Sequence, residues 1–251
     1  MRHGARWSEE LIVKALFAYH PAMANAGILY DGSEERRLNY TLEGGDVHPV
    51  RPDTLLLGFS DRSSPAALDH LCDLVFAQGG ITDVIVVVMP RERTAIHLDM
   101  IFTQLDGELC AVYPPHFAGP ERLAVLHRRK GDHGVREMPN FFAALRAVDL
   151  ALEPVMCGGA DRTTQEREQW ASACNFACLR PGLALAFSRN EATLAECAKA
   201  GFAIVPALDL LTGQQQIAER QRAIVTIEGS ELVRGGGGPR CMTLPLRRDA
   251  P

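Results

Sequence analysis

The sequence feature that most constrains the fold is a recurring order of two extended segments, a helix and one further strand. The clearest copy lies at residues 175–205, where two extended segments flank the turn tripeptide Arg180-Pro181-Gly182. Asn190 is a typical helix N-cap, Gly201 is a typical helix end, and the segment 202–205 follows as a strand. The inner face of this helix is predicted to carry Leu194, Cys197 and Ala198.

An earlier copy begins with a predicted strand at residues 54–59. Ser64-Pro65 is typical of a helix start, and Gly79-Gly80 of its end. The β-branched run 83–89 is typical of a buried strand.

A middle copy has extended segments at residues 98–104 and 109–113, which flank the hairpin signal Asp106-Gly107. A helix around 141–147 and an extended segment at 153–157 complete it. Because the spacing between copies varies, the pattern favours a ring of like modules around a shared core over a solenoid.

The remaining segments are predicted to be less regular. Residues 8–20 form a helix capped by Ser8, with Leu11, Ile12, Ala15, Leu16 and Tyr19 as its periodic apolar positions, and residues 27–30 form its strand. This is the second half of a unit, so we expect the chain to begin in mid-module. The proline-rich stretch 114–139 is predicted to be a long surface loop. The polar stretch 212–222 is predicted to be exposed before a strand at 223–227.

Composition narrows the possible partners. The 251 residues are 47% hydrophobic and carry a net charge of −5 with no basic helix face, which argues against a nucleic-acid partner. No stretch approaches the roughly 20 apolar residues that span a bilayer, and no apolar signal core follows Met1. We therefore expect a cytoplasmic protein without a membrane partner. The seven cysteines are odd in number and scattered, and Cys174 and Cys178 lack a nearby histidine, so neither a disulfide framework nor a zinc site is expected.

Three stretches combine reactive side chains with permissive glycines or a strand. Glu43-Gly44-Gly45-Asp46 presents two acids that can receive a cation, although an ordinary acidic turn has the same pattern. The period of a strand would put His97 and Asp99 on one face, as a general acid/base with its carboxylate or as a surface pair. Residues 234–242 carry four consecutive glycines and then Pro-Arg-Cys. The return to apolar sequence after Cys241 favours a folded loop over a linker, and the flanking arginines favour a thiolate.

A fourth stretch, Gly158-Gly159 followed by residues 166–170, is interpreted mainly as a tight turn before a structural helix.

In this order, the segments resemble the arginine deiminases of the pentein, or guanidine-modifying, superfamily. The resemblance runs from about Arg6 to the end of the chain. The stretches that carry it are Leu-Glu-Gly-Gly-Asp (42–46), Ser-Asp-Arg-Ser-Ser (60–64), His-Leu-Asp-Met-Ile-Phe-Thr (97–103), Arg-Glu-Gln-Trp (167–170), Arg-Asn-Glu-Ala-Thr (189–193) and Gly-Gly-Pro-Arg-Cys-Met-Thr-Leu-Pro-Leu (237–246).

The resemblance implies an α/β-propeller of ββαβ modules around a pseudo-fivefold axis, with the active site at its centre. Residues 1–251 would then form a single catalytic propeller domain that lacks its N-terminal module. The sequence also departs from the family pattern at two other places, and the missing module has a consequence for activity. The family's helical insertion is absent, and Gly236 stands where many members have a carboxylate-binding arginine. Because the first module is expected to be missing, residues 1–251 alone are expected to hydrolyse arginine poorly or not at all and to self-associate as a homo-oligomer.

The resemblance also implies roles for individual residues. Cys241 is the expected nucleophile and His97 the general acid/base, while Glu43 and Asp99 hold the guanidinium nitrogens. Arg62 and Arg6 are expected to bind the substrate α-carboxylate, and Asp46 to help position the substrate.

The implied reaction is hydrolysis of a small guanidino substrate, arginine or a close analogue, to citrulline and ammonia through a thiouronium on the cysteine. It requires no metal or organic cofactor. Amidino transfer and dimethylarginine hydrolysis remain alternatives within enzymes, and a truncated, non-catalytic remnant or binding protein is the alternative outside them.

Overall fold

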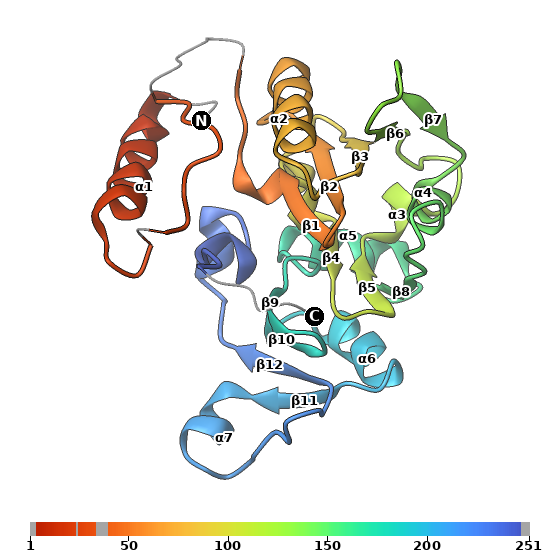
Figure 1. Cartoon of the computed structure of the whole chain (residues 1–251). Helices are drawn as coiled ribbons and strands as arrows, with labels where there is room; N and C mark the ends of the chain where they lie inside the picture. The colour runs from red at the N-terminus through yellow and green to blue at the C-terminus, as the bar shows by residue number, and fades with distance from the viewer. Residues whose placement is uncertain (1–3, 24, 34–39, 247–251) are drawn as a thin grey trace.

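The computed structural model describes residues 4–23, 25–33 and 40–246. In this part of the chain the strands form three open sheets, and helices pack beside them in a mixed α/β fold (Figure 1). Each sheet contains one antiparallel hairpin within or next to a predicted unit: β1–β2, β4–β5 and β9–β10. Strand β1 is not part of the predicted first unit. The predicted repeat is therefore present three times.

The first unit runs from β1 (Val47–Arg51) through β2 (Thr54–Phe59) and α2 (Pro65–Gln78) to β3 (Asp83–Val88). Ser64 caps α2 as predicted, because its hydroxyl accepts a hydrogen bond from the Ala67 amide. Strand β3 lies parallel to β2. The helix covers the sheet with one apolar face, and the small core between them contains Leu55, Leu57, Leu68, Leu71, Cys72, Val75 and Val84.

The second unit contains β4 (Phe102–Gln104), β5 (Leu109–Val112), α4 (Phe141–Arg146) and β8 (Glu153–Met156). The predicted hairpin turn is confirmed, since the Asp106 carboxylate accepts hydrogen bonds from the amides of residues 108 and 109. The predicted strand 98–104 is too long. Its first part is a 3₁₀ turn, η4 (Leu98–Met100), so the shared strand face that we expected for His97 and Asp99 is wrong.

The predicted surface loop at 114–139 is also wrong. It contains α3 (Pro114–Phe117) and a hairpin of β6 (Val125–Arg129) and β7 (Arg136–Met138), and β6 pairs antiparallel with β3. The four prolines fall outside both strands, where they remove no ladder hydrogen bond. The hairpin extends the first sheet to the order β1-β2-β3-β6-β7 and so connects the first two units.

The third unit comprises β9 (Ala177–Arg180), β10 (Leu183–Phe187), α6 (Glu191–Lys199) and β11 (Ala203–Pro206). After α7 (Ala207–Leu211) and an exposed stretch, the predicted strand β12 (Ala223–Ile227) inserts between β10 and β11, parallel to both. On α6, the predicted inner positions Leu194 and Cys197 are buried but Ala198 is exposed. Asn190 stands at the N-cap, but its side chain donates to the Ala171 carbonyl instead of capping.

Helix α5 (Arg162–Trp170) and short 3₁₀ turns connect the units. The turns are η2 (Gly44–Asp46), η3 (Arg93–Ala95), η4, η5 (Leu232–Gly235) and η6 (Arg240–Met242). The larger core lies where the second and third units meet the first sheet. Its members include Leu98, Ile101, Phe102, Phe117, Phe141, Phe176, Leu194 and Ile224.

The N-terminal part differs from its prediction. After η1 (Gly4–Arg6), helix α1 (Trp7–Tyr19) begins before Ser8, and none of its side chains is buried. Lys14 Nζ forms an ion pair with Asp31 Oδ2 at 2.7 Å, within the same N-terminal part. The predicted strand at 27–30 does not form. Turn hydrogen bonds occur near it, and no strand pairs with it in the described residues.

The three sheets are open, and the closed pseudo-fivefold ring stays a prediction. Among the described residues, no helix is both long and apolar enough to cross a membrane.

Candidate active site

Glu43 lies just before η2 and is almost fully buried. Its Oε2 atom lies 3.0 Å from His97 Nε2 and 2.8 Å from Arg6 Nη1, and its Oε1 atom lies 3.3 Å from Arg62 Nη1. The predicted residues Glu43, His97, Arg6 and Arg62 are therefore brought together from four separate segments. In this arrangement the two arginines pair with the carboxylate rather than with a separate anion site.

His97 is buried beside the Glu43–Asp46 turn. Gly45 permits this approach, since a Cβ atom there would come within 2.8 Å of the imidazole. Burial lowers the pKa of His97, but hydrogen bonds with Cys241 and Glu43 and the charges of Asp46 and Asp99 raise it further, to about 10. His97 is therefore an imidazolium at neutral pH, ready to donate a proton.

Asp99 lies within η4 and is buried. Its Oδ2 atom lies 3.7 Å from Cys241 Sγ and 3.4 Å from Arg240 Nε, whereas its Oδ1 atom has no hydrogen-bond partner among the described residues. Burial raises the pKa of Asp99, and the charges of Arg240 and His97 act against that rise. A buried carboxylate oxygen without a partner is costly unless a ligand uses it.

Cys241 lies in η6 with its side chain at the surface. The predicted folded loop is confirmed, because Gly237, Gly238 and Pro239 are buried before it. Gly237 has a φ of +93°, and a Cβ atom there would lie 2.9 Å from Cys241 Sγ, so glycine is needed at this position. The loop thus carries the thiol to the Asp99 carboxylate and the His97 ring.

Asp46 is fully buried and has a different environment from the other predicted site residues. It accepts hydrogen bonds from the hydroxyls of Ser60 (2.6 Å) and Ser63 (2.7 Å) and from the amide of Leu98 (2.9 Å). Burial raises its pKa to about 6, against the lowering by the His97 charge and by these hydrogen bonds. Its contacts join the segments that carry Glu43, Arg62 and His97, and a direct role toward substrate stays a prediction.

The stretch 166–170, interpreted from the sequence mainly as a structural helix, supplies buried side chains that tie neighbouring segments together behind the site. Gln169 of α5 is buried, and its amide nitrogen donates to the carbonyls of Thr94 and Met100, 2.7 Å each, on either side of His97. Glu168 caps α6 through the amides of Ala192 and Thr193. The sequence signal that could have indicated these residues is the stretch 167–170 of α5, whose buried members Glu168 and Gln169 are polar. Asn175 is a third such residue, which sequence reasoning missed, and is taken up below.

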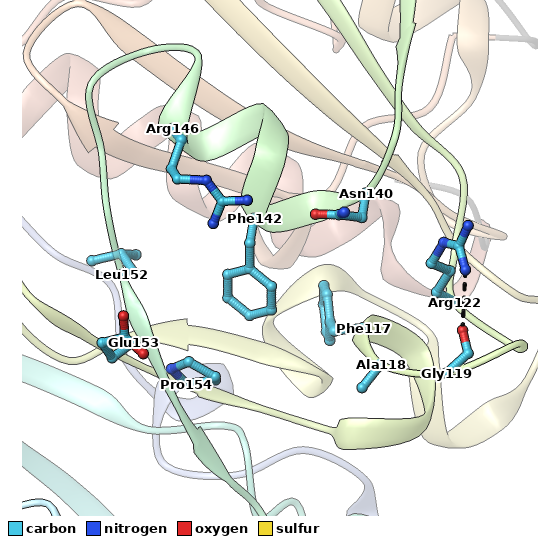
Figure 2. A pocket seen from close by; sticks show the side chains of 10 residues that line it. All are labelled: Phe117, Ala118, Gly119, Arg122, Asn140, Phe142, Arg146, Leu152, Glu153 and Pro154. Carbon is cyan, nitrogen blue, oxygen red and sulfur yellow. Dashed lines mark hydrogen bonds between the residues drawn. The ribbon is translucent and has the colours of Figure 1, made fainter.

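Outside this site, the other places where the described residues could carry chemistry would be exposed thiols, metal-binding clusters and surface hollows. Cys178 shares surface exposure with Cys241, and the remaining five cysteines are buried. The described residues contain no cluster of three His, Cys, Asp or Glu side chains suited to a metal ion. A surface hollow of about 600 Å³ between α3, α4 and β8 is lined by residues that include Phe117, Phe142, Arg122 and Arg146 (Figure 2), and none of the site residues described above lines it.

The site therefore combines an exposed thiol, a protonated imidazole and two buried carboxylates. A thiol activated by a neighbouring group can attack an electron-poor carbon, the imidazolium can protonate a leaving group, and carboxylates can hold a planar cation. These functions together suit attack on a guanidinium or amidine carbon.

Comparison with solved structures identifies related folds. SxtG, an amidinotransferase from Microseira wollei in a saxitoxin biosynthetic pathway, aligns with a TM-score of 0.56 and 12% identity over 100% of this chain and 62% of its own. A Cys-to-Ala mutant of AgrE, solved in a binary complex with L-arginine, aligns with a TM-score of 0.51 and 16% identity over 84% of this chain and 24% of its own. Both likenesses support the mixed α/β fold, and the chain spans less than two thirds of either relative.

The sequence itself carries the family assignment. A model of the family described as arginine deiminase matches residues 1–248, nearly the whole chain. Its match includes every residue of the site described above, from Arg6 to Cys241. This protein belongs to the arginine deiminase family.

Proposed function

We propose that this protein hydrolyses the guanidinium group of L-arginine, or of a close analogue, to citrulline and ammonia. The observation that supports it most directly is the convergence of the Cys241 thiol, the His97 imidazolium and the unpartnered Oδ1 atom of Asp99. Family membership supports chemistry on a guanidino group in general.

In the proposed first step, the guanidinium donates a hydrogen bond to Asp99 Oδ1. The exposed Cys241 thiol gives its proton to solvent, its thiolate attacks the guanidinium carbon, His97 donates its proton to one nitrogen, and the C–N bond breaks to release ammonia. A thiouronium remains on Cys241. Neutral His97 then takes a proton from water, the hydroxide adds to the same carbon, and the C–S bond breaks to release the ureido product.

Substrate binding must also change the contacts of Glu43. Arg6 and Arg62 now occupy its two oxygens, so a substrate guanidinium would compete with them. A substrate that also carries an α-carboxylate offers both arginines a new anionic partner, and charge stays balanced through the exchange. The proposal therefore favours arginine over agmatine, which lacks the carboxylate.

The first test uses labelling and does not depend on turnover. Chloroacetamidine, which carries a planar amidinium, should alkylate Cys241 much faster than the exposed Cys178, because the carboxylates concentrate the cation beside the thiol. Uncharged iodoacetamide should show a much smaller preference between the two thiols. Equal chloroacetamidine labelling of Cys241 and Cys178, read by peptide mass spectrometry, would exclude Cys241 as the nucleophile of a cation site.

The second test identifies the reaction. Arginine should yield citrulline and ammonia in equal amounts, and arginine should exceed agmatine in kcat/KM by roughly tenfold to 150-fold, the range for one charge-assisted hydrogen bond. With a primary amine present, release of ornithine without citrulline would show amidino transfer instead. Citrulline from dimethylarginine but not from arginine would indicate the sister hydrolase. Labelling of Cys241 without any product would favour a binding protein.

A further inference from the structure

Asn175 lies between α5 and β9 and is almost fully buried. It contacts the loop of residues 234–242 that carries Cys241, called the nucleophile loop below. Its backbone is fixed by a hydrogen bond from its own amide to the Ser172 carbonyl. No part of the reaction proposed above uses this residue. A buried amide with no chemical role normally satisfies local backbone groups, and the groups that Asn175 satisfies belong to the site.

The side-chain oxygen of Asn175 accepts two hydrogen bonds from the nucleophile loop, from the amides of Gly238 at 3.0 Å and Cys241 at 3.1 Å. Its side-chain nitrogen donates to the backbone carbonyl of Asp99 at 3.0 Å. One planar amide therefore connects the backbone of the nucleophile to the backbone of the carboxylate opposite it. This fixes which end of the amide faces the loop, because only the oxygen can accept and only the nitrogen can donate.

The loop sequence fits this contact. A Cβ atom on Gly238 would lie 2.9 Å from the Asn175 side chain, so glycine is required where the loop passes over the amide. The Asn175 carbonyl also receives the Arg240 amide at 3.4 Å. The loop thus closes against Asn175 along residues 238–241.

We propose that Asn175 is a positioning residue, which sets the Cys241 sulfur relative to Asp99 and His97 by tying the nucleophile loop to the η4 segment. The proposal rests on the proposed function for its catalytic consequence and on the hydrogen bonds alone for its structural part. Displacement of a reacting group by about 1 Å can cost about 100-fold in rate. Loss of the amide should therefore slow chemistry more than it weakens binding, because Asp99 Oδ1 and Glu43 remain in place.

The test compares Asn175→Ala with a matched control, Asn190→Ala. Asn190 is equally buried and donates one hydrogen bond to a backbone carbonyl, but it lies at α6, away from Cys241. Asn175→Ala should lower kcat about 100-fold with KM changed by less than about threefold, and Asn190→Ala should leave both within about threefold. Asn175→Asp keeps an acceptor for the two loop amides and should recover part of kcat. Equal losses in the two alanine variants would overturn the proposal.

Hydrogen exchange of the wild-type and variant proteins separates this claim from the proposed function. In Asn175→Ala, amides of residues 236–242 should exchange at least tenfold faster than in wild type, while Asn190→Ala should leave them unchanged. Unchanged exchange in Asn175→Ala would overturn the positioning role whatever the reaction. If exchange rises as expected but wild-type protein shows neither turnover nor amidinium-selective labelling, the proposed function fails and the tie between loop and η4 stands.

Discussion

The two sides of the site differ in how their backbone is fixed. One side carries the Glu43–Asp46 turn and His97, and the other is the loop 234–242. On the first side, fully buried Asp46 accepts three hydrogen bonds from two other segments. On the second side, Gly236 is exposed with a φ of +78°, and the side chain that contacts the loop amides at 238 and 241 is Asn175. The first side is thus tied by buried side-chain hydrogen bonds between segments, whereas the loop amides at 238 and 241 are held by a single side chain, Asn175. We call the first side the frame and the second, after the proposed role of Cys241, the nucleophile side.

The largest expected effect concerns the frame. Asp46→Ala removes the acceptor for Ser60, Ser63 and the Leu98 amide in a site without solvent, so the free energy of unfolding should fall by about 3 kcal/mol. Urea denaturation measures it. A loss below about 1 kcal/mol would mean that the frame is not held by Asp46, and the contrast between the two sides would disappear.

Asp99 should respond in the opposite way, although it is also buried. Its Oδ1 atom has no partner in the described structure and its charge is disfavoured by burial, so Asp99→Asn should leave the free energy of unfolding unchanged or raise it. It should lower kcat/KM for arginine about 100-fold, because the guanidinium loses a charged acceptor. A stability loss like that of Asp46→Ala would assign Asp99 to the structural frame instead.

Local sequence signals predicted much of this framework. Ser64-Pro65, Gly79 and the β-branched run of β3 specify a helix and a strand from neighbouring residues alone, and the structure confirms each of them. Pairing of β6 with β3 was missed because the prolines around 114–139 indicate a loop, while the alternation that makes β6 a strand covers only five residues.

The arrangement of the site could not be predicted from local sequence signals in the same way. Spacing suggested that His97 and Asp99 share a strand face, but a 3₁₀ turn presents both to the site. Their approach to Glu43 and Cys241 depends on contacts between distant segments, and the family resemblance, not periodicity, indicated it. Asn175 lies in none of the motifs, and Gln169, although part of the stretch 167–170, received no site role, since the function of a buried amide is recognised only once its backbone partners are known.

On the nucleophile side, two adjacent glycines provide a matched pair. Gly236 and Gly237 both have positive φ, so alanine at either costs about 1 kcal/mol in backbone strain. A Cβ on Gly236 meets open space, whereas one on Gly237 would lie 2.8 Å from Cys241 Cβ. Gly237→Ala should therefore lower kcat by about 100-fold through displacement of the thiol, and Gly236→Ala by less than about threefold. Similar activities for the two variants would show that the loop adapts more freely than its anchor at Asn175 allows.

The last comparison concerns the His97 proton, where the two sides meet, and it measures a difference in pH dependence between variants. Burial opposes that proton, while Cys241 on the loop and Glu43 on the frame both hydrogen-bond to the imidazolium and raise its pKa to about 10 from an ordinary value near 6.5. A raised folded-state pKa contributes stability that is complete below about pH 6.5 and is lost as pH rises through about 10. Urea denaturation across this range should give the steepest decline for wild type, a shallower one for Cys241→Ala and the shallowest for His97→Gln. If Cys241→Ala matches wild type, the frame alone holds the proton. If His97→Gln matches wild type, His97 is not the group that couples the two sides.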